Sequence, residues 1–379
     1  MSINIKFLNK NLLLFSLVLS IPTILNAQNW IEGKGIEINY FHSNMMRHSK
    51  KITAPLAENT STFELSLTQK AKGDKDWQIR RNYPETGVGL FYVDYNRPDI
   101  YGQAIGIVPH IRLRLITLEH FAWSVRMGMG ICYYTTPYQK VPNNNIENET
   151  IGSYLNNLTP METDLRYIIN QHLTFQAGIH LIHLSNGSYR RPNFGINIWG
   201  IQAGIQYFPI PNNPKRIVRP LPELKNRILL YPKVAISFIE QGQSDGGLNR
   251  VYNVGAYATK RYLGKNKIIL GTDYTYNTAT YSYLKYNDLK EGQENKYASQ
   301  ISIYAGNEFE FNRIGIVLQG GVYLRRMFEQ HDTWYEKLGV NFYCYKKETG
   351  FLKEGLVSIM LKAHKNRAEL FEIGFAVGF

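Results

Sequence analysis

The sequence has few cysteines, few acidic residues relative to basic ones, and no long apolar run beyond its first residues. Its two cysteines, Cys132 and Cys344, cannot form a disulfide framework, and neither has a Cys or His neighbour at metal-ligand spacing. Neither a Gly-rich phosphate loop nor an HExxH motif is present, which argues against nucleotide-dependent enzymes and zinc proteases. The sequence therefore implies no metal and no cofactor. A length of 379 residues permits one large or two small domains.

Basic residues outnumber acidic ones, with 43 Lys and Arg against 30 Asp and Glu and a formal net charge of +13. These basic residues are spread along the chain without a recognition motif, so we expect no nucleic-acid partner. A basic protein at a cell surface meets anionic lipid or polysaccharide instead. Most of the excess is accounted for by loop and lumen residues.

Residues 1–27 are typical of a cleaved signal peptide. Lys6 and Lys10 make the first segment basic, an apolar run over 12–25 follows, and Ala27 stands at a plausible cleavage point. The run is shorter than the roughly 20 apolar residues that a membrane helix needs, and Pro22 interrupts it. We therefore expect a secreted protein.

Apolar and polar residues alternate with a period of two over long segments, in a chain that contains 27 Tyr, 18 Phe and 31 Gly. Because side chains alternate across a strand, such segments predict strands with one apolar and one polar face. Segments of ten residues or more, with rows of Arg, His and Gln on the polar face, favour an outer-membrane β-barrel with a hydrated lumen over a soluble sandwich. Residues 369–379 alternate in the same way and end in Phe379, which resembles the C-terminal signal of bacterial outer-membrane barrels.

The expected fold is thus an all-β antiparallel barrel in the bacterial outer membrane, with roughly 14–16 strands. The five prolines within residues 209–226 make that stretch a connection, with about eight strands on each side. Either one large barrel forms, or a barrel over 28–208 is followed by a second eight-stranded unit over 227–379. We favour one barrel, because two barrels would each need their own closure.

Residues 175–208 carry the candidate chemistry. His183 and Ser185 share the apolar face of one predicted strand, and Asn197 begins the apolar face of the next. Polar groups on a face that looks at hydrocarbon are costly and tend to be functional. A serine activated by a histidine, which a third group orients, is the usual arrangement for acyl transfer. Ser185, His183 and Asn197 are therefore the candidate nucleophile, base and orienting residue of an esterase at the membrane rim.

The segment contains His183-Leu184-Ser185-Asn186 and, after five intervening residues, Pro192-Asn193-Phe194-Gly195. With these residues it resembles the outer-membrane lipid A 3-O-deacylases (PagL-like) of the acyloxyacyl hydrolase family. The resemblance implies that His183 is the base and Ser185 the nucleophile, that Asn186 and Asn193 stabilise the oxyanion, and that the substrate is lipid A or lipopolysaccharide. It is clear over 175–208, only architectural over 86–173, and does not extend to 227–379.

One residue departs from this family, whose third triad member is a Glu where this chain has Asn197. An Asn orients the imidazole but brings no charge to stabilise an imidazolium. Three consequences follow as alternatives: lower activity, a contribution from another acid, or an inactive branch. The loop residues Arg190 and Arg191 match phosphate geometry and are expected to contact lipid A phosphates or to be solvated. The competing hypothesis is a non-catalytic porin or structural barrel with a degenerate site, because a small deacylase barrel does not need the second group of strands.

Overall fold

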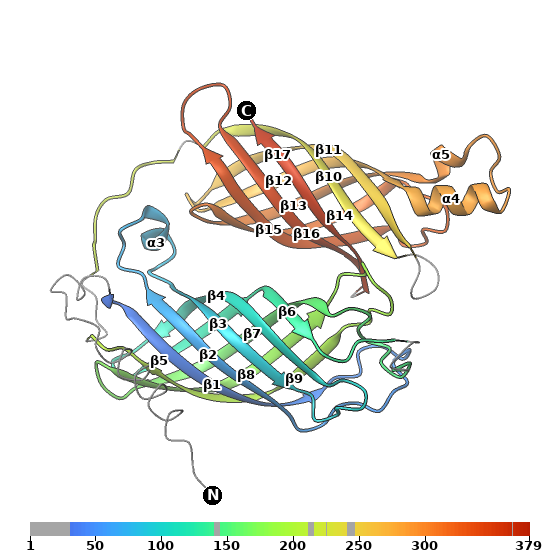
Figure 1. Cartoon of the computed structure of the whole chain (residues 1–379). Helices are drawn as coiled ribbons and strands as arrows, with labels where there is room; N and C mark the ends of the chain where they lie inside the picture. The colour runs from blue at the N-terminus through green and yellow to red at the C-terminus, as the bar shows by residue number, and fades with distance from the viewer. Residues whose placement is uncertain (1–30, 140–144, 211–215, 225, 241–246, 366) are drawn as a thin grey trace, which may run out of the picture.

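The computed structural model describes residues 31–139, 145–210, 216–224, 226–240, 247–365 and 367–379. The predicted signal peptide, residues 1–27, lies outside these ranges. Two antiparallel barrels follow one another along the chain and are drawn one above the other in Figure 1. Within the described ranges, no helix is long and apolar enough to cross a membrane.

The N-terminal barrel closes before the proline-rich connection begins. Its first strand pairs with its last, so that Ile36 lies opposite Tyr207. Two short strands, β5 and β6, both pair with β4 and β7 and together fill one position, which gives a ring of eight positions. The elements are β1 Lys34–Met45, β2 Thr60–Lys70, α3 Asp76–Arg80, β3 Glu85–Asp94, β4 Gln103–Thr117, β5 Phe121–Gly128, β6 Gly130–Tyr134, β7 Leu155–Ile168, β8 Leu173–Ser185 and β9 Ile196–Tyr207.

The break between β5 and β6 has a local cause. The register against β4 is the same on both sides of the break, since His110 lies opposite Gly128 and Ile107 opposite Ile131. The residues next to the break on the two flanking strands are Pro109 on β4 and Pro160 on β7. Because proline has no N–H to donate, the hydrogen-bond ladder lacks a donor on each side at this point.

The C-terminal barrel is a second closed ring of eight strands. It closes through β10 and β17, with Val234 opposite Phe375. Two short helices extend from the end where β12 finishes. The elements are β10 Ile228–Glu240, β11 Leu248–Tyr262, β12 Asn266–Asn277, α4 Thr278–Tyr286, α5 Glu294–Tyr297, β13 Ser299–Phe311, β14 Ile314–Arg325, β15 Trp334–Lys346, β16 Glu354–His364 and β17 Arg367–Gly378.

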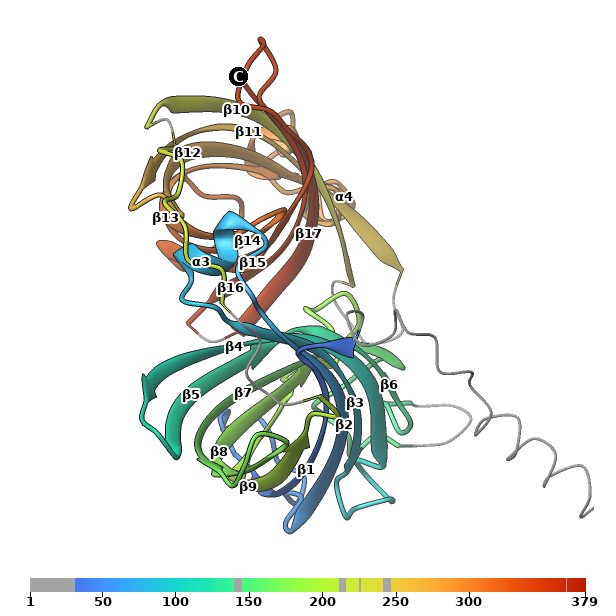
Figure 2. The same cartoon turned by 90° about the vertical axis from the view of Figure 1, so that its left-hand side faces the viewer.

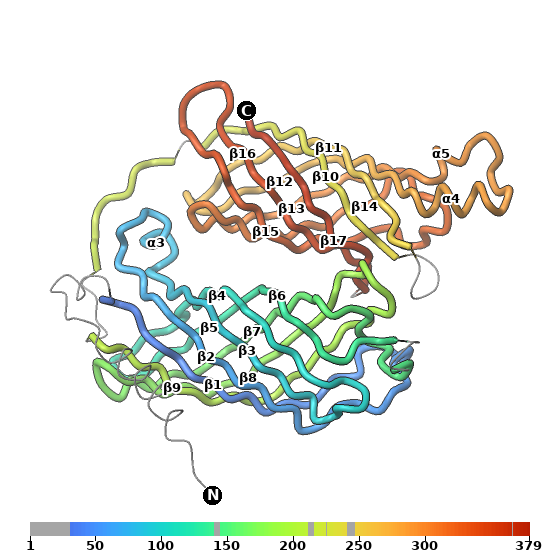
Figure 3. Tube along the Cα trace, viewed as in Figure 1, coloured from blue at the N-terminus to red at the C-terminus, as the bar shows by residue number. Residues whose placement is uncertain are grey.

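The all-β barrel class expected from the sequence is confirmed, in the form of two eight-stranded barrels. The preference for one large barrel is wrong, because β1 pairs with β9 and shuts the first ring. The Cα trace in Figure 3 shows the two rings as separate bodies.

The interior of each barrel holds charged side chains rather than the hydrated lumen expected from the sequence. In the N-terminal barrel, Arg112 and Arg126 are 1% exposed. Arg112 Nη2 lies 2.7 Å from Glu37 Oε1, and Arg126 also binds Glu37 together with Glu64 and Glu162. Alternating positions on the same strands carry exposed apolar side chains outward. The charged side chains of the interior thus pair with one another, because closing a small barrel brings the polar faces of its strands into contact.

The barrels lie side by side, and Figure 2 looks into both from the end at which α3 lies. Contacts at that end come from α3 and the residue that follows it. Arg81 Nη2 donates to the carbonyl of Lys265 at 2.6 Å, and the rings of Trp77 and Phe311 have centroids 6.2 Å apart. A second set of contacts, at the opposite end, involves the loop between β8 and β9.

Candidate active site

The candidate site lies where β8 ends and β9 begins. His183 and Asn197 are directly opposite each other in this antiparallel pair. Ser185 follows His183 by two positions, so both side chains leave the same face of β8. That face carries the exposed Ile179, and the matching face of β9 carries the exposed Trp199. The three polar side chains therefore stand on the outward face of the barrel, as the alternation predicts.

A chain of hydrogen bonds joins these three side chains. His183 Nδ1 lies 2.6 Å from Asn197 Oδ1, and His183 Nε2 lies 2.9 Å from Ser185 Oγ. Because a carboxamide oxygen only accepts, Nδ1 carries the ring proton and Nε2 accepts from the serine hydroxyl. This is the tautomer that a general base requires. Both ring nitrogens are thus occupied, and among the described residues no acidic side chain binds the imidazole in place of Asn197.

The loop between the two strands closes over this arrangement at Gly195. This glycine has φ +78°, and a Cβ built on it would lie 3.0 Å from His183 Cε1. Its N–H donates to the carbonyl of Thr150 at 3.0 Å, which fixes the end of the loop. Ser185 beneath is only 2% exposed. Glycine is required here both for the backbone conformation and for the close approach to the histidine ring.

The two asparagines expected at the oxyanion lie next to the serine and bind each other. The N–H of Asn186 donates to Asn193 Oδ1 at 2.9 Å. Asn186 also donates from Nδ2 to Ser153 Oγ at 2.8 Å, and it is 1% exposed. The structure thus brings both residues to the site. In this arrangement, the N–H next to the nucleophile is held by Asn193.

The sequence reasoning missed three polar residues around the site. Asn157 and Thr159 on β7 lie opposite Ser185 and His183, on the side away from Asn197. Thr159 Oγ1 donates to Asn157 Oδ1 at 2.6 Å. The alternation along residues 155–168 could have found this pair, since it places both on the outward face.

The third missed residue, His48, belongs to the loop after β1. Its Nε2 lies 2.7 Å from the carbonyl oxygen of Phe194, so it binds the backbone of the loop that covers the site. No sequence signal could have found it, because its position depends on how the loop after β1 folds.

The loop arginines meet the second barrel. Arg190 Nη1 lies 3.2 Å from Glu240 Oε1, and the backbone N–H of Arg191 donates to Glu240 Oε2 at 2.5 Å. Arg191, Asn193 and Phe194 also line a cavity of about 580 Å³ that the N-terminal barrel shares with the C-terminal barrel. Within the part of the chain that the structure describes, no group of three His, Cys, Asp or Glu side chains could hold a metal ion.

Comparison with known proteins divides the chain in the same way. Residues 61–206 match the family model of lipid A 3-O-deacylase (PagL), and residues 230–379 match the model of the acyloxyacyl hydrolase C-terminal domain. No curated protein matches the chain.

Solved structures of outer-membrane barrels are also similar. The outer membrane enzyme PagL is 16% identical, covers 44% of this chain and 97% of its own, and has a TM-score of 0.31. A BenF-like porin from Pseudomonas fluorescens Pf-5 is 10% identical, covers 92% of this chain and 97% of its own, and has a TM-score of 0.22. The outer membrane protein opdK from Pseudomonas aeruginosa is 8% identical, covers 91% and 98%, and has a TM-score of 0.24.

Proposed function

We propose that this chain, which joins a lipid A 3-O-deacylase (PagL) domain to an acyloxyacyl hydrolase C-terminal domain, is an outer-membrane serine esterase that removes an ester-linked acyl chain from lipid A. The observation that carries the proposal is the hydrogen-bonded chain Ser185–His183–Asn197. It stands at the end of an outward apolar surface, where a lipid ester arrives without entering a barrel.

The surface of the barrels supports a place in the outer membrane. Exposed apolar side chains such as Ile38, Leu65 and Ile107 recur on the outward faces of neighbouring strands. A contiguous apolar surface of this kind is costly in water and matches the outward band of a membrane barrel. The acyl chain of a lipid then lies along β8 and β9, with its ester at the level of Ser185.

The reaction proceeds in two halves. Ser185 Oγ attacks the ester carbonyl while His183 Nε2 takes its proton, and the tetrahedral intermediate collapses as the imidazolium returns the proton to the departing lipid A hydroxyl. Water then attacks the acyl-serine, with His183 again as the base, and releases the fatty acid. The products are a free fatty acid and a lipid A with one acyl chain fewer, so the enzyme is regenerated without a cofactor.

Asn186 and Asn193 are proposed to stabilise the oxyanion. Oxyanion holes use backbone and carboxamide N–H donors held in advance of the reaction. Asn186 directly follows Ser185, and Asn193 is bound to its backbone N–H. The N–H of Asn186 exchanges its bond with Asn193 Oδ1 for one with the oxyanion, and the Asn193 carboxamide turns with it.

Asn197 fixes the tautomer but adds no negative charge. In a Ser-His-Asp triad, an Asn in place of the acid lowers kcat by about 10⁴-fold because it selects the wrong tautomer. Here Asn197 directs its oxygen at Nδ1, which selects the right one. We therefore propose an active but slow esterase rather than a lapsed one.

A serine-reactive fluorophosphonate tests the nucleophile directly. The purified protein should gain one adduct on the peptide that contains Ser185 and should release fatty acid from lipid A in detergent. Ser185→Ala should lose both. Ser61→Ala is the matched control, because Ser61 lies on β2 and its hydroxyl bonds that of the exposed Tyr40 on β1 rather than a residue of the site. Labelling of another serine, with undiminished release by Ser185→Ala, would overturn the assignment.

A further inference from the structure

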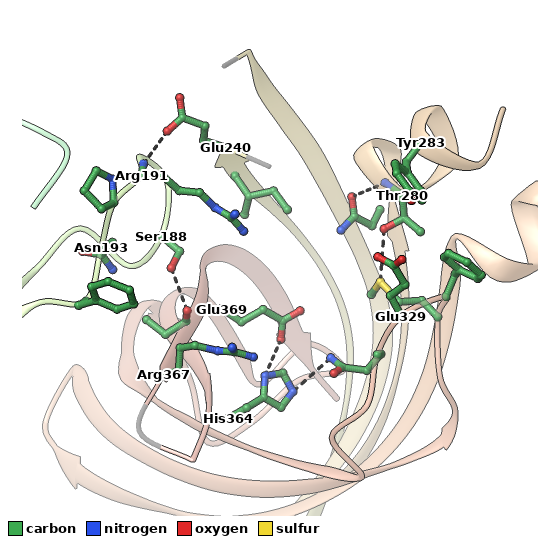
Figure 4. A pocket seen from close by; sticks show the side chains of 18 of the residues that line it. Ser188, Arg191, Asn193, Glu240, Thr280, Tyr283, Glu329, His364, Arg367 and Glu369 are labelled. Atoms are coloured by element: carbon green, nitrogen blue, oxygen red, sulfur yellow. Dashed lines mark hydrogen bonds and ion pairs between the residues drawn. The ribbon is translucent and has the colours of Figure 1, made fainter. Parts of the chain in front are cut away.

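The loop over the candidate site, residues 186–195, is held by the second barrel at three points. Figure 4 shows two of them, from Arg191 to Glu240 and from Ser188 to the chain beside Arg367. The third is a packing contact beneath Gly187. None of these contacts comes from the barrel that carries Ser185, although the loop belongs to that barrel.

Glu240 makes the strongest of the three contacts. It is the last residue of β10, and its side chain is 0% exposed. Its Oε2 accepts the backbone N–H of Arg191 at 2.5 Å, and its Oε1 forms an ion pair with Arg190 at 3.2 Å. A buried carboxylate is stable only when it is paired and hydrogen-bonded. Glu240 therefore holds the backbone of this loop as well as one of its side chains.

The other two contacts lie closer to the nucleophile. Ser188 Oγ donates to the carbonyl of Ala368 at 2.8 Å, at the start of β17. Gly187, with φ +62°, lies so close to Phe371 that a Cβ on it would overlap the phenyl ring. Gly187 and Ser188 are the second and third residues after Ser185, so β17 contacts the loop within three residues of the nucleophile.

We propose that the C-terminal barrel is a clamp for the active-site loop, and that Glu240 is a positioning residue for the deacylation. The inference rests on the proposed function. The loop carries Asn193, two residues after Arg191, and Asn193 binds the N–H of Asn186 beside Ser185. The position of these donors is set by where the loop is held. The site is thus complete only when the second barrel is present, which gives the acyloxyacyl hydrolase C-terminal domain a role in the reaction.

Trypsin cleavage measures how firmly the loop is held, and it does not require the protein to be an active esterase. The loop contains one bond that trypsin can cut, between Arg190 and Arg191, because Pro192 protects the next. In the folded wild type this peptide bond should resist cleavage, since the N–H of Arg191 is held by Glu240. In Glu240→Ala it should be cut at least about tenfold faster, as expected for a loop that opens locally. Glu348→Ala is the matched control, because it removes another Glu–Arg ion pair of the same 3.2 Å length, with Arg227.

Kinetics on lipid A then tests positioning. Glu240→Ala should lose kcat by about 100-fold, the size that a misplacement of 1 Å produces, with KM changed much less. Glu240→Gln keeps an acceptor for the Arg191 N–H, so its kcat should lie between those of Glu240→Ala and the wild type. If Glu240→Ala does not fold, Ser188→Ala removes one loop contact with less disturbance and should show the same two effects, reduced.

Unchanged trypsin resistance and unchanged kcat in both Glu240→Ala and Ser188→Ala would overturn the clamp. A wild type without activity would overturn the proposed function alone, and the trypsin result would still decide the clamp. A higher KM with unchanged kcat, in a variant whose loop still resists trypsin, would also overturn the clamp.

Discussion

His183 and Asn197 face each other across β8 and β9, with Nδ1 and Oδ1 2.6 Å apart. The pair sets the direction of the whole hydrogen-bonded chain, because an oxygen at Nδ1 leaves Nε2 as the acceptor for Ser185. It also places an amide where the resembling family has a carboxylate. This chain therefore keeps the hydrogen-bond geometry of the His183 imidazole but lacks a negative charge beside it.

Restoring that charge should raise the rate. Asn197→Glu should increase kcat on lipid A by about tenfold, since hydrogen bonds to charged groups exceed neutral ones by about 1.4 kcal/mol. Asn197→Gln is the control, because it has the length of Glu without its charge. A fatty-acid release assay on both variants decides the point. Equal rates for Glu and Gln would contradict the account of Asn197.

Gly195 should tolerate no side chain. Gly195→Ala places a methyl group 3.0 Å from His183 Cε1 and strains a backbone at φ +78°, so it should lower kcat and cost about 1–2 kcal/mol of folding free energy. Gly292→Ala separates the two effects, because Gly292 has φ +71° with nothing within 4 Å. Urea unfolding and kcat are measured on both. Loss of kcat in Gly292→Ala as well would show that strain alone, and not contact with His183, is responsible.

The interior of the N-terminal barrel depends on its arginines. Arg126→Ala leaves Glu64 and Glu162 buried without their arginine and leaves Glu37 with Arg112 alone, so it should lower the free energy of unfolding by about 3–5 kcal/mol. Urea titration in detergent measures the loss. Arg97→Ala, which removes an exposed pair with Asp99, should change stability far less. Equal losses would show that the buried network is not what stabilises the barrel.

Two filled barrels should not conduct ions. Arg112 and Arg126 occupy one lumen, and Lys337, which binds Asp273 and Glu372, occupies the other. Planar bilayers with the purified protein should therefore show no stepwise conductance at currents that a porin gives under the same conditions. Regular steps would support the porin hypothesis instead.

Much of this fold could be predicted from period-two alternation. The parity of residues 175–208 puts His183, Ser185 and Asn197 on the outward face, where the structure has them. The same parity would have found Asn157 and Thr159. Closure could not be predicted, because it depends on Ile36 meeting Tyr207, two positions far apart in the chain that no local pattern connects.

The clamp could not be predicted for the same reason. Glu240 ends an ordinary amphipathic strand, and nothing near it in the sequence indicates that it binds Arg190 and Arg191. That contact exists only because two closed rings pack together at the ends of β8 and β10. Local patterns predict which face of a strand a residue occupies, whereas the packing between the barrels determines which residues it contacts.

Mass spectrometry of lipid A tests the central claim most directly. Cells that express the wild type should contain lipid A that has lost the mass of one acyl chain, while cells with Ser185→Ala at equal expression should keep the unmodified species. Lipid A of unchanged mass in the wild type, or the same loss with Ser185→Ala, would contradict the account of Ser185 as the nucleophile of a lipid A esterase.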